Sequence, residues 1–567
     1  MSEPWREISR RKQDERKSRI PPEWRIQSAS IPNNGSMLDV PRTCGLLTSR
    51  ELSITESHSA VSLLAALVER KYTSLEVATA FCKRAAIAQQ CCNCLTEVMF
   101  EDAMARAKWL DEEFARRGKP VGLLHGLPIS LKDSFKAKGY DSTVGLAALA
   151  FKPAKENSTL VDILLEAGAV LYVKTNTPQA MMALDSHNNV FGRTLNPRNP
   201  HVTAGGSSGG EGALIAMRGS ILGVGTDVGG SIRIPAMCNG VYGIKPSFSR
   251  IPFIGQESGG PPGMGGLGLK ASAGPMATNL RDCELFLRVV SDSGPWERDP
   301  SVVFGEWRSQ GTFPAKSLVG VLRSDGNTRP HPPVAKVLEE TVQALKTSGV
   351  EVVEIDAMKS GFQKCNALAN KFFTIEGGNN WLSLLESTKE RLSPWLSTRV
   401  VGKRPMMRTE TLLSLHAAKE QLEAEMLSIW RDENGRRLDA IICPVAPHVT
   451  PEVDRWGGMG YTSAFVMLDY PAGTLPIRDI SPSDLSLGFS HSETPLNNKF
   501  DQGNRELWDG KGIDRKVYLE STLCVQVVVA RLQERKLVGA MGVVEQALKK
   551  GGKKGDVAVA SEKAAKL

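Results

Sequence analysis

The chain has 567 residues, of which 41% are hydrophobic and 23% are charged. These proportions are typical of a globular protein in water, and no apolar run reaches the roughly 18 to 20 residues that a transmembrane helix needs. The net charge of +8 is spread along the chain except for "KKGGKKG" near the end, so it does not indicate a nucleic-acid groove.

The N-terminal segment is strongly charged. Its first residues, "MSEPWREISRRKQDERKSR", lack the apolar core of a secretory signal and are too acidic for a transit peptide. Residues 1–45 are predicted to form a charged helical extension. Thr73 and Glu76 have the spacing of a capping box, which predicts that a helix begins there. We therefore expect the first hundred residues to be mainly helical.

Ten cysteines occur at irregular spacings. The one sequence cluster, residues 91–94, lacks a second C-x-x-C or a histidine pair at zinc spacing. We therefore expect reduced, mostly buried thiols and no metal site.

From Leu127 onward the sequence no longer predicts mainly helices. Short apolar runs such as "AVLYVKT", "VGVLRS" and "EVVEI" alternate with helical stretches such as "VAKVLEETVQALKTSG". This alternation predicts an α/β fold within residues 46–549, with a single large mixed, mostly parallel twisted sheet covered by helices on both faces. The Gly/Pro-rich segments 255–274 and 471–482 are predicted to be long loops over a cleft. The basic tail, residues 550–567, is predicted to be disordered.

Two glycine-rich runs match known motifs. "GMGGLG", residues 263–268, has the G-x-G-x-x-G pattern, but prolines precede it and no helix start follows, so we do not predict a dinucleotide site; a P-loop motif is also absent. "HVTAGGSSGGEGALIA", residues 201–216, satisfies the G-x-S-x-G nucleophile elbow. One hypothesis is therefore a Ser-His-Asp hydrolase in which Ser208 attacks, because eight histidines are available as a base.

Ser231 follows two glycines in a third run, "GTDVGGSIRIPA", residues 225–236. Two glycines allow the backbone to turn sharply, so that several N–H groups point at one spot beside the hydroxyl and hold a developing oxyanion. The alternative interpretation is a plain glycine-rich turn that Ser231 caps.

Lys132 ends the apolar strand "GLPISLKD". Side chains at the carboxyl end of a strand in an α/β sheet are placed to line a cleft. Burial there can depress the pKa of a lysine by up to about 3 to 5 units, which makes a neutral amine available as a base near pH 7. The alternative is a solvated or salt-bridged lysine.

Three stretches together, "GLPISLKDSF", "GGSSGGEGALIA" and "GTDVGGSIRIPA", resemble the amidase signature family of serine hydrolases. The similarity covers nearly the whole chain except both tails, with the signature core at about residues 125–280, and within the family it is greatest to fungal acetamidases and fatty acid amide hydrolases. The resemblance implies the amidase signature fold and a Ser-cis-Ser-Lys triad. In this triad Ser231 is the nucleophile, Ser207 is the bridging serine after a cis peptide, and Lys132 is the base.

The resemblance also assigns roles around the triad. The backbone N–H groups of Ser231 and the three residues before it are expected to form the oxyanion hole: Val228, Gly229 and Gly230. Three residues are expected to support the loop: Ser208, Asp227 and Arg233. For the last two, a salt bridge is the alternative explanation. Met181 and Met182 fall where relatives place acyl-pocket residues, although core packing explains them equally well.

The predicted function is hydrolysis of a small carboxamide to a carboxylic acid and ammonia or amine through an acyl-enzyme, without metal or cofactor. The alternatives are an amidotransferase subunit and a catalytically silent homologue that binds a ligand. A homodimer is favoured because helical N-terminal segments pair subunits in some relatives. The last three residues, Ala565-Lys566-Leu567, resemble a peroxisomal targeting signal, so the expected location is cytoplasmic or peroxisomal.

Overall fold

The computed structural model describes residues 3–260, 267–400, 402–455, 458–489, 496 and 498–551. Residues 552–567 of the predicted tail, with its final tripeptide, and residues 263–266 of the G-x-G-x-x-G run lie outside the described residues. None of the described helices is long and apolar enough to cross a membrane.

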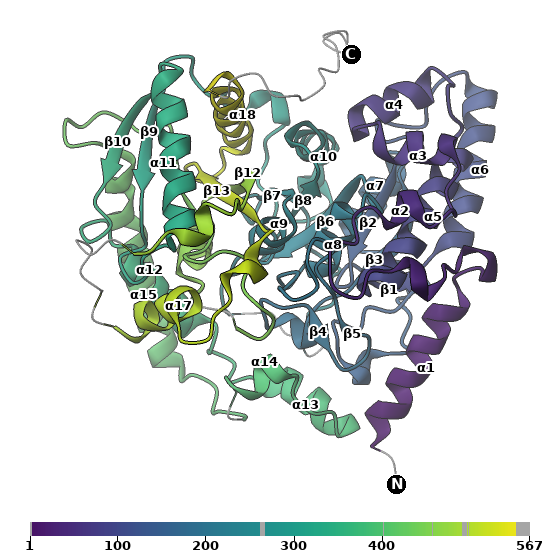
Figure 1. Cartoon of the computed structure of the whole chain (residues 1–567), viewed down its shortest axis with the longest axis horizontal. Helices are drawn as coiled ribbons and strands as arrows, with labels where there is room; N and C mark the ends of the chain where they lie inside the picture. The colour runs from purple at the N-terminus through teal and green to yellow at the C-terminus, as the bar shows by residue number, and fades with distance from the viewer. Residues whose placement is uncertain are drawn as a thin grey trace.

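The described strands are β1 (Leu95–Val98), β2 (Pro128–Lys132), β3 (Val170–Thr175), β4 (His187–Asn188), β5 (Gly192–Arg193), β6 (Leu222–Asp227), β7 (Tyr242–Lys245), β8 (Ser272–Ala277), β9 (Leu318–Leu322), β10 (Glu351–Ile355), β11 (Ala440–Pro444), β12 (Ala472–Asp479) and β13 (Thr522–Val528). Strands β4 and β5 form a separate ribbon. The others form an 11-stranded sheet in the order β1-β3-β2-β6-β8-β7-β12-β13-β11-β9-β10 (Figure 1).

The sheet is mixed, and the prediction that it is mostly parallel is wrong. Parallel pairing occurs in β2–β3, β2–β6, β9–β10 and β9–β11. The antiparallel pairs outnumber these within the described residues: β1–β3, β6–β8, β7–β8, β7–β12, β11–β13 and β12–β13. A strand covered on both faces has the same apolar sequence whichever way its neighbours run. The alternation of strands and helices therefore indicated the layers of the fold but not the strand directions.

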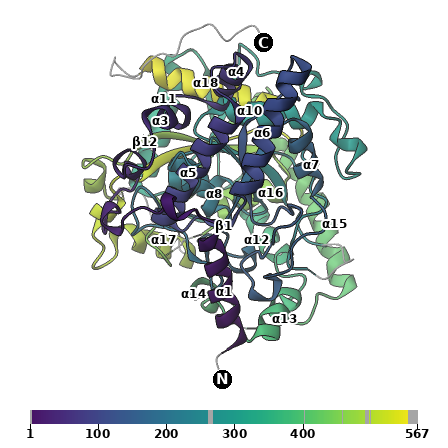
Figure 2. The same cartoon turned by 90° about the vertical axis from the view of Figure 1, so that its right-hand side faces the viewer.

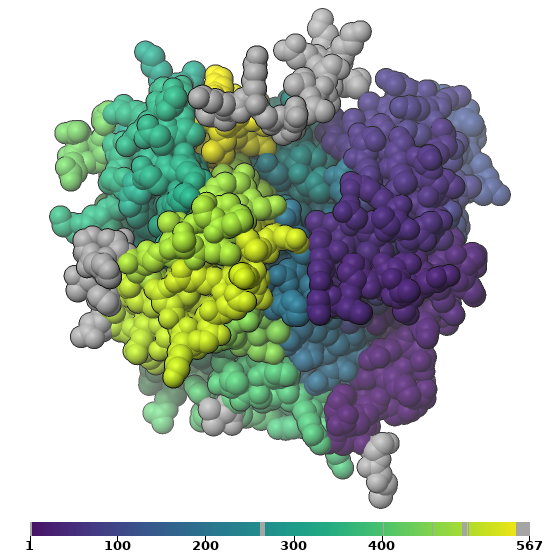
Figure 3. Space-filling view, in the orientation of Figure 1, coloured from purple at the N-terminus to yellow at the C-terminus, as the bar shows by residue number. Residues whose placement is uncertain are grey.

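The described α-helices are α1 (Pro4–Ser18), α2 (Val40–Thr43), α3 (Ser49–Glu56), α4 (Ala60–Val68), α5 (Ser74–Cys92), α6 (Phe100–Arg117), α7 (Thr159–Glu166), α8 (Gly209–Ala216), α9 (Arg233–Asn239), α10 (Leu280–Asp292), α11 (Pro332–Thr347), α12 (Phe362–Phe372), α13 (Asn379–Thr388), α14 (Pro394–Ser397), α15 (Thr409–Met426), α16 (Gly460–Met467), α17 (Lys499–Asp509) and α18 (Glu534–Gly551). Helices α8 and α9 pack together against β2, β6, β7, β12 and β13, whereas α10, α11 and α18 pack together against β8, β12 and β13. In the space-filling view, the N-terminal part of the chain covers one side and the C-terminal part the other (Figure 3).

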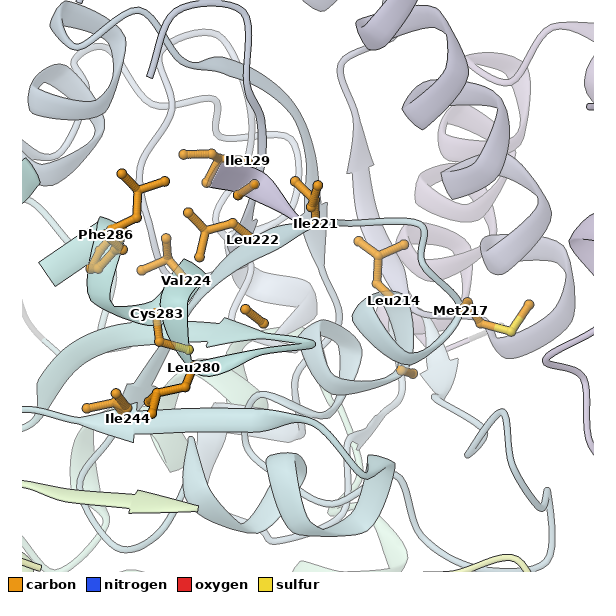
Figure 4. Close-up of a cluster of buried hydrophobic side chains, with 14 of the residues drawn as sticks. Ile129, Leu214, Met217, Ile221, Leu222, Val224, Ile244, Leu280, Cys283 and Phe286 are labelled. Atoms are coloured by element: carbon orange, nitrogen blue, oxygen red, sulfur yellow. The ribbon is translucent and has the colours of Figure 1, made fainter. Parts of the chain in front are cut away.

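Strand β6 shows how the sequence places a different layer on each face of the sheet. Gly223 and Gly225 face α8 and α9, and a Cβ atom added at Gly223 would lie 2.1 Å from Glu211 Oε2. Leu222 and Val224 point to the opposite face, where they join the buried hydrophobic cluster that includes α10 (Figure 4). The glycines therefore let α8 approach the strand closely, while the alternating aliphatic residues form core.

The first hundred residues are mainly helical, as predicted. The capping box of Thr73 and Glu76 is present at the start of α5, and α5 packs against α6 on the side shown in Figure 2. All ten cysteines are free, and all except Cys44 are buried. The prediction of reduced, mostly buried thiols is confirmed.

The loop predicted for residues 471–482 is instead largely strand β12, which pairs with β7 on one edge and with β13 on the other. Pro471 lies just before the strand. Pro476 lies at a register shift and beyond the residues that pair with β7. No backbone hydrogen bond to β7 is therefore lost through its missing N–H. The two prolines suggested a loop because their positions relative to the neighbouring strands are not visible in the sequence.

Candidate active site

Lys132 is the last residue of β2 and its side chain is completely buried. Its Nζ donates hydrogen bonds to Ser207 Oγ at 2.6 Å and to Thr226 Oγ1 at 2.7 Å. Burial lowers the pKa of Lys132 to about 7, although nearby carboxylates oppose the shift. A substantial fraction of this amine is therefore neutral near pH 7 and able to accept a proton.

Ser207 lies in the turn that leads into α8, and the peptide bond between Gly206 and Ser207 is cis. The surrounding backbone leaves no space for side chains. A Cβ at Gly206 would lie 2.6 Å from Ala183 O, and one at Gly210 would lie 2.4 Å from Asn176 N. The glycines of this run therefore hold the serine turn and the first turn of α8 directly against neighbouring backbone.

Ser231 lies between β6 and α9, and its carbonyl oxygen accepts a hydrogen bond of 3.2 Å from Ser208 N. The structure thereby brings the loop that carries Ser231 against the residue that follows Ser207. Both Ser207 and Ser231 are buried, with 3% and 6% of their surface exposed. The three residues predicted as a triad thus come from β2, the entry to α8 and the entry to α9.

The four N–H groups predicted for the oxyanion hole differ in their partners. Gly230 N donates to Asp227 Oδ1 at 2.7 Å, so this group is engaged by the loop itself. Among the described residues, no protein acceptor engages the N–H groups of Val228, Gly229 and Ser231. These three donors are the ones free to bind an anionic oxygen.

Asp227 and Arg233 form a completely buried ion pair, with Arg233 Nε 3.0 Å from Oδ2 and Nη2 3.0 Å from Oδ1. Burial alone would raise the pKa of Asp227, but Arg233 outweighs this effect and holds it at about 2. The Asp227 carboxylate also accepts from Ile232 N at 3.1 Å. The pair therefore fixes the turn that contains Ser231, and the predicted salt bridge is present.

The hydroxyl of Ser208 lies 3.4 Å from both the N and the O of Thr226. Within the ranges that the structure covers, no histidine hydrogen-bonds to it; His491 lies outside those ranges. The Ser-His-Asp hypothesis built on Ser208 has no described base.

Met181 is the last residue of the short 3-10 turn Gln179–Met181, and Met182 follows it; Ala180 and Met181 both have positive φ. Met181 packs beside Leu382 and Leu385 of α13 in a hydrophobic cluster separate from the main core. Met182 is 47% exposed. Core packing therefore describes Met181, and a substrate-pocket role for either methionine stays a prediction.

Four residues in or around the site were not identified from the sequence. Thr226, whose hydroxyl accepts from Lys132 Nζ, and Glu211, whose charge acts on Lys132, lie inside the glycine-rich runs. Gln526 Oε1 accepts from Arg233 Nη1 at 2.6 Å, and the carbonyl of Thr462 accepts from Nη2 at 3.1 Å. The last two contacts span more than 200 residues of chain, and no local pattern could have indicated them.

The described residues contain no group of three or more His, Cys, Asp or Glu side chains that could hold a metal ion. The chemistry available in this part of the chain is that of a buried amine, neighbouring hydroxyls and free backbone donors, which is suited to acyl transfer.

Comparison with known proteins agrees with this chemistry. The family model described as "Amidase" matches residues 76–538. The chain is 35% identical to an acetamidase of Emericella nidulans over 94% of this chain and 97% of that protein. It is 37% identical to an acetamidase of Aspergillus oryzae over 83% of this chain and 87% of that protein. A solved structure of fatty acid amide hydrolase superposes with a TM-score of 0.87 at 28% identity and covers 95% of both chains.

The chain therefore belongs to the amidase family. It is an amide hydrolase that acts on carbon–nitrogen bonds, and the resemblance inferred from the three signature stretches is confirmed.

Proposed function

We propose that this enzyme hydrolyses a small carboxamide through a Ser-cis-Ser-Lys triad and a covalent acyl-enzyme. The observation that carries the proposal is the 2.6 Å hydrogen bond between the buried Lys132 Nζ and Ser207 Oγ, next to the loop of Ser231. A lysine in this position supplies the base that the described histidines do not supply to Ser208.

The chemistry begins with proton transfer. Neutral Lys132 accepts the proton of Ser207, Ser207 accepts the proton of Ser231, and Ser231 Oγ attacks the amide carbon. Because an amide nitrogen is a poor leaving group, the same relay returns a proton through Ser207 to the nitrogen as the carbon–nitrogen bond breaks. Water then attacks the acyl-enzyme in the same way and releases the carboxylic acid.

The charge that develops on the carbonyl oxygen is stabilised by backbone donors. We assign this role to the N–H groups of Val228, Gly229 and Ser231, since no described protein acceptor engages them. Gly230 serves instead through its bond to Asp227, which keeps the turn in shape.

The substrate class is proposed from the relatives. The two acetamidases named above align with most of this chain, which favours a short aliphatic primary amide. We therefore propose acetamide as the first substrate to examine. Homodimer formation and peroxisomal import remain predictions from the sequence.

The test uses the purified full-length chain alone. Ammonia release is measured with acetamide, aromatic amides, indole-3-acetamide and long-chain acyl amides, and the acyl-enzyme is sought by intact-protein mass spectrometry after rapid acid quench. We expect turnover by the wild type, none by Ser231→Ala, and retained turnover by Ser208→Ala at a reduced rate.

Each other result of these assays supports one of the alternative hypotheses. If Ser208→Ala is inactive and Ser231→Ala active, the nucleophile is Ser208. Turnover only in the presence of added partner subunits indicates an amidotransferase subunit. Binding without turnover of any amide indicates a silent homologue.

A further inference from the structure

Three buried carboxylates raise the pKa of Lys132, and two of them are each paired with another cationic side chain. They are Asp227, Glu211 and Asp133. Asp227 is paired with Arg233 at 3.0 Å. Asp133 faces the buried Lys174, whose Nζ lies 3.8 Å from Asp133 Oδ1. The charges of these two carboxylates are therefore largely compensated without Lys132.

Glu211 is the third carboxylate, and its described contacts are neutral. Its Oε2 accepts from Ser130 Oγ at 2.6 Å and its Oε1 accepts from Thr175 Oγ1 at 2.9 Å. No ion pair involves Glu211 within the described residues, and the side chain is completely buried. A buried carboxylate without a cation is costly while it is ionised, so its charge calls for compensation from the nearest base.

The geometry of strands β2 and β3 identifies Lys132 as that base. Ser130 and Lys132 are two residues apart on β2, so their side chains point to the same face, about 7 Å apart along the strand. Thr175 is the register partner of Lys132 on β3 and donates to Glu211. Glu211 thus bonds to Ser130, on the same strand as the lysine, and to Thr175, opposite the lysine on β3. Ser207, four residues before Glu211 in the chain, bonds to the lysine itself.

We propose that Glu211 is a positioning residue for Lys132, whose carboxylate holds α8 against β2 and β3 and supplies the counter-charge of the lysine. The inference rests on the proposed function, in which Lys132 is the base. The pair takes up and releases a single proton near neutral pH, so the lysine keeps enough proton affinity to return the proton to the leaving nitrogen.

The other ionisable groups around this pair do not change charge in the same range. Tyr172 of β3 and Cys94, just before β1, are buried beside Glu211, and burial raises the pKa of each well above its ordinary value. Both therefore stay neutral at neutral pH. Asp227, on the other side of Lys132, stays ionised because Arg233 holds its pKa at about 2. Burial raises the pKa of Glu211 to about 7, against the opposing effects of its hydroxyl donors and of Lys132.

The experiment measures the pH dependence of kcat/KM in Glu211→Gln and Glu211→Asp. In Glu211→Gln the amide keeps the shape, but the ammonium of Lys132 loses its counter-charge. We expect the acid limb of the kcat/KM pH profile to move to lower pH by about one unit. In Glu211→Asp the charge remains and the bonds to Ser130 and Thr175 are lost, so kcat falls while the limb stays in place. An unmoved limb in Glu211→Gln, or an equal displacement in both variants, overturns the proposal.

Asp282→Asn is the matched control. Asp282 is an equally buried carboxylate without an ion pair among the described contacts; it accepts from Ala60 N at 2.9 Å and Val61 N at 3.2 Å. Its replacement is expected to lower stability without moving the acid limb. Lys132→Met separates the two proposals: if it retains activity, the proposed function fails, whereas an inactive Lys132→Met with an unmoved Glu211→Gln limb contradicts only the role of Glu211.

A double variant covers the case in which Glu211→Gln does not fold. Removing one member of a buried charge pair leaves the other uncompensated, whereas removing both does not. We expect Lys132→Met/Glu211→Gln to be more stable to urea than additivity of the two single variants allows, and to fold even where Glu211→Gln fails. Strict additivity, or a double variant that is less stable than additivity allows, overturns the pairing.

Discussion

Arg233 binds both carboxylate oxygens of Asp227 at 3.0 Å, and the same carboxylate accepts the N–H of Gly230 at 2.7 Å. Replacing Arg233 with Met leaves Asp227 as an uncompensated buried charge. We expect the free energy of unfolding to fall by about 3 to 5 kcal/mol, with loss of activity because the Ser231 turn loses its anchor. Urea unfolding measures the effect. Arg298→Met, which breaks an exposed pair with Glu166, is the control and should change stability little.

The activity of the wild type should depend on pH through Lys132. Only the neutral amine accepts a proton, and the pKa of the buried lysine is about 7. As the pH rises through this value the neutral fraction increases, so kcat/KM should rise and level off above it. The pH profile with acetamide measures this. An acid limb at the much higher pKa of an exposed lysine would exclude Lys132 as the base in its buried state.

Gly210→Ala should damage the site through the backbone. The added Cβ meets Asn176 N at 2.4 Å and Cys94 O at 2.6 Å, and neither atom can rotate away. We expect α8 to shift, which costs about 1 to 3 kcal/mol of stability and lowers kcat/KM by about a hundredfold as Ser207 moves from Lys132. Gly503→Ala, in α17 with nothing within 4 Å, should instead be stabilising by about 1 kcal/mol. Equal effects of the two changes would contradict this explanation.

Lys12→Met should show that α1 is tied into the fold. The buried Lys12 Nζ contacts Glu97 at 2.6 Å and Asp141 at 2.7 Å, and both carboxylates are almost completely buried. Loss of the cation is expected to cost about 3 to 5 kcal/mol in urea unfolding. Arg10→Met, on the exposed side of the same helix, is the control. If both variants unfold at the same urea concentration, the buried contacts of Lys12 contribute nothing to stability.

The features that sequence reasoning predicted well depend on local chemistry. The capping box at Thr73 depends on residues three positions apart, and the end of the strand at Lys132 depends on a run of apolar neighbours. In each case the residues that determine the structure adjoin one another in the chain.

The features that could not be predicted depend on distant parts of the chain. The strand status of residues 471–482 depends on β7 and β13, and the direction of most strands depends on where long connections return. The hydrogen bond from Gly230 N to Asp227 follows from the shape that Arg233 and its partners impose on the turn. Such contacts leave no periodicity or spacing that a reader of the sequence could use.

The place of β13 in the sheet has a consequence for biosynthesis. This strand lies between β12 and β11, and among the described strands it is the one link by which β11, β9 and β10 join the rest of the sheet. A ribosome makes Thr522–Val528 after all the other described strands, so strands β9 to β11 keep an unpaired edge until β13 has been synthesised. A stop codon ahead of Thr522 would therefore leave an intact Lys132 and Ser231 in a sheet that has lost one of its ends.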